Sequence, residues 1–234
     1  TAKATFATTT EALAKVRQLG ARDPQLMPQV FLSDDRLRYF AALPAPHKLA
    51  PLRILSIGRQ LYWKGFQYGL EAVSLLKQKG VPFIYTIVGE GPYNSVLKSL
   101  ASQLGIENDI IFIPRVQGDI GHALQDCHVL LHPALHESFG NVCLEALAAG
   151  RPVICLNVGG PASQVTPECG FAAPILCPKG AVMSIANQLA KLATQPGKWQ
   201  QMSEAAKTRA QSGFALEKLR ENILHTYRRV QSAT

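Results

Sequence analysis

The chain has 234 residues, of which 47% are apolar and 17% are charged, and its formal net charge is +8. This apolar content is enough for one large α/β core or two smaller ones, and it excludes an intrinsically disordered chain. The excess of Lys and Arg favours anionic partners such as phosphates, nucleic acid or an acidic membrane surface, and the charge alone does not choose among them.

The start of the chain and its cysteines bear on the cellular compartment of the protein. The chain begins with Thr1 and lacks a signal-like start or a bilayer-spanning apolar segment, so we expect a piece of a longer cytoplasmic chain. The five cysteines are Cys127, Cys143, Cys155, Cys169 and Cys177. Because they are odd in number and form no CxxC pair, we interpret them as reduced residues of the core.

Residues 1–48 fit the main pattern less well and are expected to be the tail of a preceding domain with a linker. A strand-like segment at 4–8 precedes a helical pattern at 11–19, and a second short strand is expected near 29–32. A proline-bearing linker then leads into the next domain.

Residues 49–213 alternate short apolar runs with amphipathic segments, a pattern typical of a doubly wound parallel sheet. The expected strands are 53–57, 83–88, 110–113, 129–131 and 153–156. The expected helices among them are 66–79, 93–104, 119–125 and 141–149. Closing helices are expected at 181–192 and 198–231, the latter broken near 212–213, so that 214–234 forms a C-terminal helix.

Two loops that follow expected strands carry groups suited to anions, which bind beyond the carboxyl ends of parallel strands. The loop from Gly58 to Gly65 contains Arg59 and Lys64, a planar fork and a mobile charge that suit a diphosphate. The alternative is a pair of solvated surface cations. The loop at Gly89 lets the backbone approach a ligand closely, or is a structural turn.

The third loop combines two glutamates with the start of a helix. Glu137 precedes the free N–H groups near Phe139, Gly140 and Asn141, which can bind phosphate while the carboxylate addresses sugar hydroxyls. Glu145 interrupts an apolar helix, where a buried carboxylate is costly unless hydroxyls such as a ribose diol, or cations, satisfy it. The alternative makes Glu145 solvent-facing and Glu137 a loop charge.

Other chemistries find little support in the sequence. His132 and His136 match no trusted metal-binding spacing and have no third ligand nearby, so no metal site is expected. Nucleic acid is not expected as a partner, because no aromatic platform is interleaved with basic residues.

The segment Glu137 to Val153, ESFGNVCLEALAAGRPV, together with Gly159-Gly160, resembles the two-glutamate motif of the GT-B glycosyltransferases of family 4. The resemblance extends over roughly Leu52 to Val165. It implies a Rossmann-like sheet with closing C-terminal helices, the C-terminal donor-binding half of a retaining enzyme. Such an enzyme transfers a hexosyl unit from a nucleoside-diphosphate sugar to a glycan or a lipid-linked sugar, without a cofactor or an essential metal.

The resemblance also implies roles for individual residues. Arg59 and Lys64 would grip the donor diphosphate and act as electrostatic catalysts. Glu145 would hold the ribose, and Glu137, the third catalytic residue, would contact the donor sugar. The other donor-binding residues that the resemblance implies are Gly58, Gly89, Val116, Ser138, Phe139, Gly140 and Asn141.

The chain departs from the family pattern at Pro114 and Ser163, where Gly and Glu are common, and both changes bear on donor binding. The acceptor is expected to bind mainly to a missing N-terminal domain, so this piece alone should transfer little. Its basic C-terminal stretch suits peripheral contact with the inner membrane face or a solvated helix face. The alternatives in function are a nucleotide-sugar epimerase or a phosphorylase of the same architecture, and a non-catalytic nucleotide-binding module.

Overall fold

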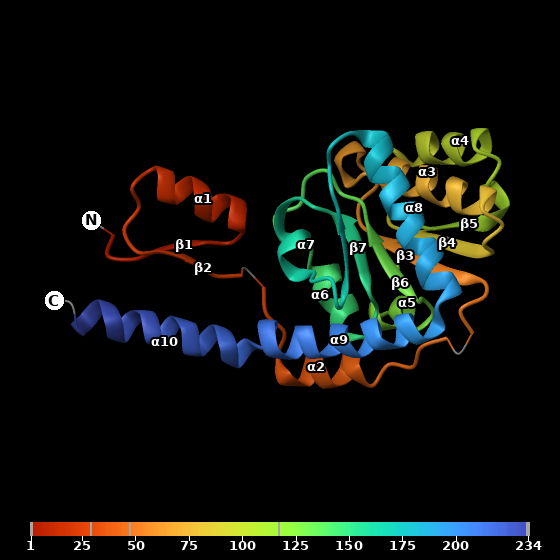
Figure 1. The fold of residues 1–234 in the computed structure, drawn as a ribbon. Helices are drawn as coiled ribbons and strands as arrows, with labels where there is room; N and C mark the ends of the chain where they lie inside the picture. Colours follow the sequence, from red (N-terminus) through yellow and green to blue (C-terminus); the bar gives the residue numbers. More distant parts are fainter. Residues whose placement is uncertain (1, 29, 47, 117, 233–234) are drawn as a thin grey trace.

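A computed structural model describes residues 2–28, 30–46, 48–116 and 118–232 of the chain. Its main body is a parallel sheet with helices on both faces, and a smaller unit formed by the first elements lies beside the long C-terminal helix (Figure 1). The predicted Rossmann-like doubly wound sheet is confirmed.

The main sheet contains six strands in the described part of the chain. They are β3 (Leu52–Ile57), β4 (Phe83–Val88), β5 (Ile110–Ile113), β6 (Val129–His132), β7 (Val153–Leu156) and β8 (Gly170–Ala173). The order is β5-β4-β3-β6-β7-β8, and every neighbouring pair is parallel. The chain moves outward from β3 to β5 and then returns to β6 on the other side of β3. Ligand sites of such sheets lie at this switch point, beyond the carboxyl ends of the strands.

Strands β6 and β7 are buried on both faces, because their side chains point alternately to the two sides of the sheet and helices cover both sides there. Ile54 and Leu131 belong to the apolar cluster under α3 (Phe66–Gln78), α4 (Asn94–Gln103) and α8 (Pro178–Thr194). Their neighbours Leu55 and Leu130 belong to the cluster on the opposite face. That second face is covered by α2 (Asp34–Ala41), α5 (Gly121–Gln125), α6 (Asn141–Ala148) and α9 (Pro196–Phe214).

The small N-terminal unit differs from the sequence-based expectation. Strand β1 (Thr5–Ala7) and helix α1 (Thr10–Gln18) lie where they were expected, but the second strand, β2, is Pro24–Leu26 and pairs in parallel with β1. The strand expected near 29–32 is therefore wrong in residues 30–32, where Leu32 forms an isolated bridge, and residue 29 lies outside the described residues.

Helix α2 was not foreseen, although its start carries a recognisable signal. The Ser33 hydroxyl accepts a hydrogen bond from the backbone N–H of Arg36 at 3.3 Å, and two aspartates occupy the first turn. A capping serine followed by acidic residues favours a helix start. Leu37 and Phe40 anchor the helix because both are buried in the cluster beneath it.

The break between the last two helices lies at Ala215 rather than near residues 212–213. Helix α9 continues to Phe214, and α10 spans Leu216–Ser232. Ala215 is extended because it pairs with Leu32: the N–H of Leu32 donates to the carbonyl of Phe214 at 2.8 Å, and the N–H of Leu216 donates to Leu32 at 2.9 Å. A contact with the N-terminal segment thus fixes where the helix ends.

Two short elements near the end of the sheet were not predicted. They are α7 (Gly159–Gln164) and β8. Among the described helices, none is long and apolar enough to cross a membrane.

The cysteine interpretation needs one correction. Cys127, Cys143, Cys155 and Cys169 are buried, but Cys177 is exposed at the start of α8, where its sulfur accepts a hydrogen bond from the N–H of Gly180 at 3.3 Å. Its place in the chain is therefore explained by helix capping rather than by burial in the core.

The segment before β3 is tied to the main body by Arg151, a fully buried arginine between α6 and β7. Its guanidinium donates to the carbonyls of Leu124 and Ala149, each at 2.8 Å, and to that of Pro44. Leu124 and Ala149 lie at the ends of α5 and α6, whose carbonyls carry partial negative charge. The start of the expected linker is therefore tied to the main body through Pro44.

Candidate functional site

The loops after β3 and β4 pack tightly against each other at the carboxyl edge of the sheet. The N–H of Gln60 donates to the carbonyl of Glu90 at 2.8 Å, and its side chain donates to the carbonyl of Gly89 at 2.5 Å. Gly89 has a φ of 134°, and a Cβ there would lie 2.0 Å from the carbonyl oxygen of Gly58. The absence of a side chain at Gly89 therefore permits this close approach of the two loops.

Lys64 and Glu137 meet across the switch point. They lie 73 residues apart in the chain, yet the ammonium of Lys64 donates to the Glu137 carboxylate at 2.5 Å. Both side chains are largely buried, at 21% and 19% exposed. This contact forms because β3 and β6 are neighbours, so the loops that follow them converge.

Glycine also makes the convergence of these loops possible. Gly65 has a left-handed φ of 69°, and a Cβ there would lie 1.8 Å from the carbonyl oxygen of Pro133. The N–H of Leu135 donates to the carbonyl of Trp63 at 2.8 Å, which ties the two loops together. Lys64 is thereby held at the end of β6.

The environment of Glu137 strongly favours its ionised form. Nε2 of His132, at the end of β6, lies 3.5 Å from the same carboxylate oxygen that Lys64 contacts. The contact with His132, followed by the hydrogen bond and charge of Lys64, lowers the pKa of Glu137 from 4.5 to about 2, against the opposing effect of burial. His132 thus helps to keep the Glu137 carboxylate ionised. The sequence analysis missed this role because it considered His132 only as a metal ligand.

The start of α6 is built on the glycine pair that the motif contains. Gly140 precedes the helix with a φ of 80°, and the N–H of Gly160 donates to the carbonyl of Glu137 at 3.1 Å. A Cβ on Gly160 would lie 2.1 Å from the Cα of Phe139. The buried amide of Gln164 adds a hydrogen bond to the carbonyl of Phe139 at 2.5 Å. The loop before α6 is therefore held rigidly. The first backbone N–H groups of a helix have no acceptor within the helix, so at the start of α6 they point out of its N-terminal end.

The remaining expected residues differ in exposure. Ser138 and Asn141 are exposed at the start of α6, whereas Phe139 is buried and packs against Phe214 with 6.1 Å between ring centroids. Arg59 is exposed on its loop. The ion pair at the switch point joins Lys64 to Glu137 and does not include Arg59.

Val116 lies at a groove of about 440 Å³ that runs along β3, β4 and β5 beside α5. The groove is lined mainly by aliphatic side chains, including Leu55, Val88 and Ile113. It is open because α5 is very short and leaves part of this sheet face uncovered. Val116, one of the expected donor-binding residues, therefore borders an apolar surface.

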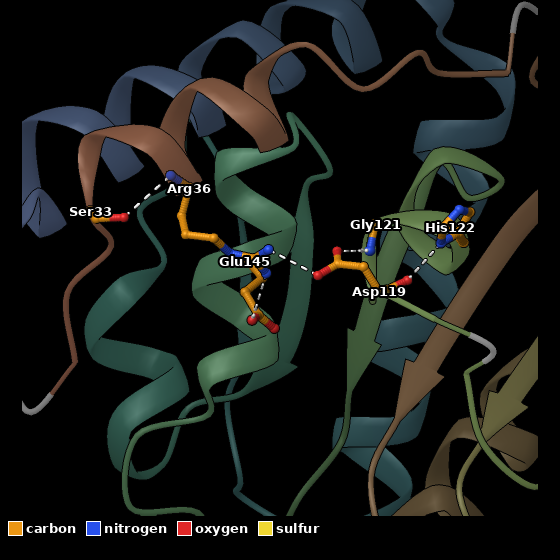
Figure 2. Close-up of polar contacts among 6 residues, drawn as sticks. All are labelled: Ser33, Arg36, Asp119, Gly121, His122 and Glu145. Carbon is orange, nitrogen blue, oxygen red and sulfur yellow. Dashed lines mark hydrogen bonds and ion pairs between the residues drawn. The ribbon is translucent and has the colours of Figure 1, made fainter.

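Glu145 has a cationic partner that the sequence did not reveal. Arg36, from α2, reaches toward Glu145 on α6 and toward Asp119 in the loop before α5 (Figure 2). The guanidinium lies 3.9 Å from Glu145 and 2.9 Å from Asp119. Burial raises the pKa of Glu145, and the charge of Arg36 opposes that rise.

Asp119 is held ionised by the backbone that follows it. The N–H of Gly121 donates to its carboxylate at 2.8 Å, and this bond, with the bond from Arg36, lowers the pKa of Asp119. Arg36 and Asp119 lie in no recognised sequence motif, and both are distant from Glu145 in the sequence. The capping signal at Ser33 could have shown the helix, but no local signal shows which side chains it meets.

The fold is an α/β domain in which Lys64 and Glu137 pair at the carboxyl ends of its central strands, and Glu145 on α6 faces Arg36. The family described as Glycosyl transferases group 1 matches residues 44–209, and the chain belongs to this family.

Curated relatives are similar over part of their length. An uncharacterised glycosyltransferase of Haemophilus influenzae is 31% identical over 180 residues, which cover 75% of this chain and 49% of that protein. The 2-deoxystreptamine glucosyltransferase of Streptomyces kanamyceticus is 30% identical over 144 residues, or 60% of this chain and 36% of that protein. The chain thus spans about half or less of the length of these relatives.

Solved structures of glycosyltransferases share the fold. Anabaena HepE in complex with UDP has a TM-score of 0.77 at 20% identity, covering 97% of this chain and 64% of that one. The pneumococcal O-GlcNAc transferase GtfA, in complex with UDP and GlcNAc, has a TM-score of 0.76 at 17% identity, covering 97% of this chain and 45% of that one. At such identities the likeness concerns the fold.

Proposed function

We propose that this chain is the donor-binding part of a retaining glycosyltransferase of family 4, which transfers a hexosyl unit from a nucleoside-diphosphate sugar to an acceptor. The observation that carries the proposal is the 2.5 Å contact between Lys64 and Glu137 at the switch point of the sheet. It places a cation for phosphate and a carboxylate for sugar hydroxyls side by side, next to the start of α6. Family membership supports the same reaction class.

In the proposed reaction, the bond between the anomeric carbon and the diphosphate oxygen breaks, and its electron pair stays on the diphosphate. The acceptor oxygen bonds to the anomeric carbon and passes its proton to the leaving diphosphate. Negative charge therefore grows on the diphosphate, where Lys64, Arg59 and the N-terminal end of α6 would stabilise it. Because these fixed groups supply the positive charge, we propose that no metal ion is essential.

Donor binding would redistribute the contacts of Lys64. Its ammonium has three donors, so it can keep Glu137 and also reach a phosphate. Glu137, with its pKa at about 2, is ionised at neutral pH and can accept hydrogen bonds from the sugar. Glu145 would accept from the ribose hydroxyls, and the main chain at Val116 would meet the base.

The acceptor would bind mainly to the remainder of a longer protein, which the partial coverage of the relatives supports. By their names, the relatives include a 2-deoxystreptamine glucosyltransferase and a putative glycosyltransferase of colanic acid biosynthesis. Membrane contact through α10 has less support, since Lys218 and Arg220 pair with Glu221 at 3.2 Å and Glu217 at 3.6 Å within the helix. These pairs favour a solvated face.

The first test is calorimetric titration of the chain with UDP, GDP, ADP and their sugar conjugates, in EDTA. Lys64→Met removes the charge and keeps most of the side-chain stem. Lys191→Met, on the exposed face of α8, changes the net charge equally and is the control. We expect one nucleotide to bind, with affinity reduced by roughly tenfold or more in Lys64→Met and little changed in Lys191→Met.

Three outcomes would contradict the proposal or a part of it. Equal losses in both lysine variants would mean that only the net charge matters. No binding of any of these nucleotides to the wild-type chain would remove the proposed donor site. Binding that is lost in EDTA and restored by a divalent cation would instead contradict the metal-independent part.

A further inference from the structure

Arg36 stands between two carboxylates that belong to different parts of the sheet domain. It comes from α2, before the first strand of the main sheet, whereas Asp119 follows β5 and Glu145 lies in α6. Figure 2 shows its side chain extended toward both carboxylates. One cation therefore links a segment outside the main sheet to two segments inside it.

The position of the guanidinium is set before any ligand arrives. Ser33 caps the helix at the backbone of Arg36, and the guanidinium lies over the ring of Phe40, 4.4 Å from its centroid. Phe40 is fully buried, so the ring is a fixed platform. A cation stacked on an aromatic face loses little further freedom when it binds a carboxylate.

The two carboxylates share Arg36 unequally. Asp119 receives a hydrogen bond at 2.9 Å, whereas the nearest oxygen of Glu145 lies 3.9 Å away, beyond hydrogen-bonding distance. Glu145 thus feels the positive charge while its lone pairs stay available. Asp119 is in turn fixed by the N–H of Gly121 at 2.8 Å, which keeps Arg36 from turning fully to Glu145.

We propose that Arg36 is a positioning residue of the nucleoside subsite, which keeps Glu145 negatively charged and free to accept hydrogen bonds from the ribose diol. The inference rests on the proposed function, because it takes Glu145 as the ribose ligand. It makes the segment before the sheet a determinant of donor recognition, and it makes the site selective for nucleotides that carry both ribose hydroxyls.

Charges on the elements around α6 support this assignment. Among the described residues, burial and the charge of Asp119 raise the pKa of Glu145, and Arg36 is the cation that opposes them. On α9, Arg209 donates instead to the carbonyls of Gln164 and Ser163, at 3.0 and 3.1 Å. Without Arg36, Glu145 would therefore bind a proton at higher pH and become a weaker acceptor.

The experiment compares Arg36→Gln with Arg36→Lys and with Arg38→Gln. Arg38 lies on the same helix, is exposed and pairs with Asp35 at 2.6 Å, so its variant is the matched control. Each protein is titrated by calorimetry with the preferred member of UDP, GDP and ADP, and with the 2′,3′-dideoxy analogue of that nucleotide, between pH 6 and 8. Thermal melting checks that each variant is folded.

We expect Arg36→Gln to weaken binding of the ribonucleotide by roughly tenfold at pH 6 and by less at pH 8, because higher pH restores the charge of Glu145. Binding of the dideoxy nucleotide should change less than twofold. Arg36→Lys should recover most of the loss, since it restores the charge, and Arg38→Gln should bind like the wild type.

Equal losses for the ribonucleotide and its dideoxy analogue would overturn the inference and leave Arg36 a structural residue. Tighter binding in Arg36→Gln would also overturn it, because Arg36 would then obstruct the site. An NMR titration of the Glu145 carboxyl group decides independently of affinity: an unchanged pKa in Arg36→Gln would refute the role. If the wild-type chain binds none of the three nucleotides, the proposed function fails first, and this inference fails with it.

Discussion

His128 is predicted to make the stability of the fold depend on pH. It lies directly before β6 and is fully buried. Its Nδ1 accepts a hydrogen bond from the backbone N–H of Arg53 at 2.9 Å, which places the proton of the neutral ring on Nε2. Its carbonyl accepts from the indole of Trp199 at 2.8 Å. Burial, followed by the positive charge of Arg53, lowers the pKa of His128 from 6.5 to about 4.

The size of the effect follows from this difference. Between pH 6.5 and 4 the unfolded chain binds a proton at this histidine that the folded chain does not bind, so the free energy of unfolding falls as the pH falls. The pKa difference is 6.5 − 4, or 2.5 units, and each unit corresponds to about 1.4 kcal/mol, giving a loss of about 3.5 kcal/mol. The contribution of neutral His128 to the free energy of unfolding is complete above pH 6.5, and it is lost as the pH falls toward 4.

The assay is urea unfolding at several pH values from 7.5 to 4.5 for the wild type and His128→Asn. The Asn side-chain oxygen can replace Nδ1 as the acceptor, and it does not titrate. We expect His128→Asn to be less stable at pH 7.5 and to lose less stability on acidification, so that the two curves converge by roughly 2 kcal/mol or more. His225→Asn, at an exposed position on α10, should follow the wild-type profile. Parallel curves for the wild type and His128→Asn would refute the reasoning.

Two further predictions concern the site. Gly65→Ala should lose donor binding and be destabilised well beyond Gly80→Ala, because their φ values match at 69° and 71° but only Gly65 would meet the carbonyl of Pro133, at 1.8 Å. The left-handed conformation alone costs about 1–2 kcal/mol, and equal melting temperatures with intact binding would contradict the steric argument. The lowered pKa of Glu137 stabilises the fold above pH 4.5, and this contribution is lost as the pH falls toward 2. Lys64→Met should raise that pKa, and an unchanged carboxyl titration by NMR would show that Lys64 does not stabilise the carboxylate.

The central part of the fold could be predicted closely because its signals are local. Strands 83–88, 110–113 and 153–156 have the expected bounds, since each is a short apolar run set between helical segments. Strand β8, by contrast, has the sequence GFAA, which lacks the β-branched residues that mark a strand. It is a strand because it pairs with β7, a partner that local composition does not show.

The errors in the N-terminal region have the same physical origin. Residues 30–32 are apolar and look like a strand, but Leu32 finds its backbone partners at the junction of α9 and α10. That same contact, and not the Ser-Gly pair near 212–213, sets the end of α9. Where backbone hydrogen bonds join segments almost two hundred residues apart, the sequence of neither segment determines the outcome alone.

In the candidate site, too, local sequence indicates individual residues but not the contacts between them. Lys64, Glu137 and Glu145 could be predicted as candidates because each lies in a loop or helix whose composition is unusual for its place. Their relations could not: the contact between Lys64 and Glu137 depends on β3 and β6 being neighbours, and Arg36 reaches Glu145 from a helix that precedes the family match, which begins at residue 44.

The position of Arg36 separates it from the other groups of the proposed donor site. The groups that we propose to meet phosphate and sugar lie inside the residues that the family matches, 44–209. Arg36 lies outside it and acts on Glu145 through charge at 3.9 Å rather than through a hydrogen bond. If Glu145 holds the ribose as proposed, a substitution at Arg36 would change how strongly the site depends on the ribose without altering the groups proposed to hold the diphosphate. Nucleoside recognition and transfer chemistry would then be separable in this protein.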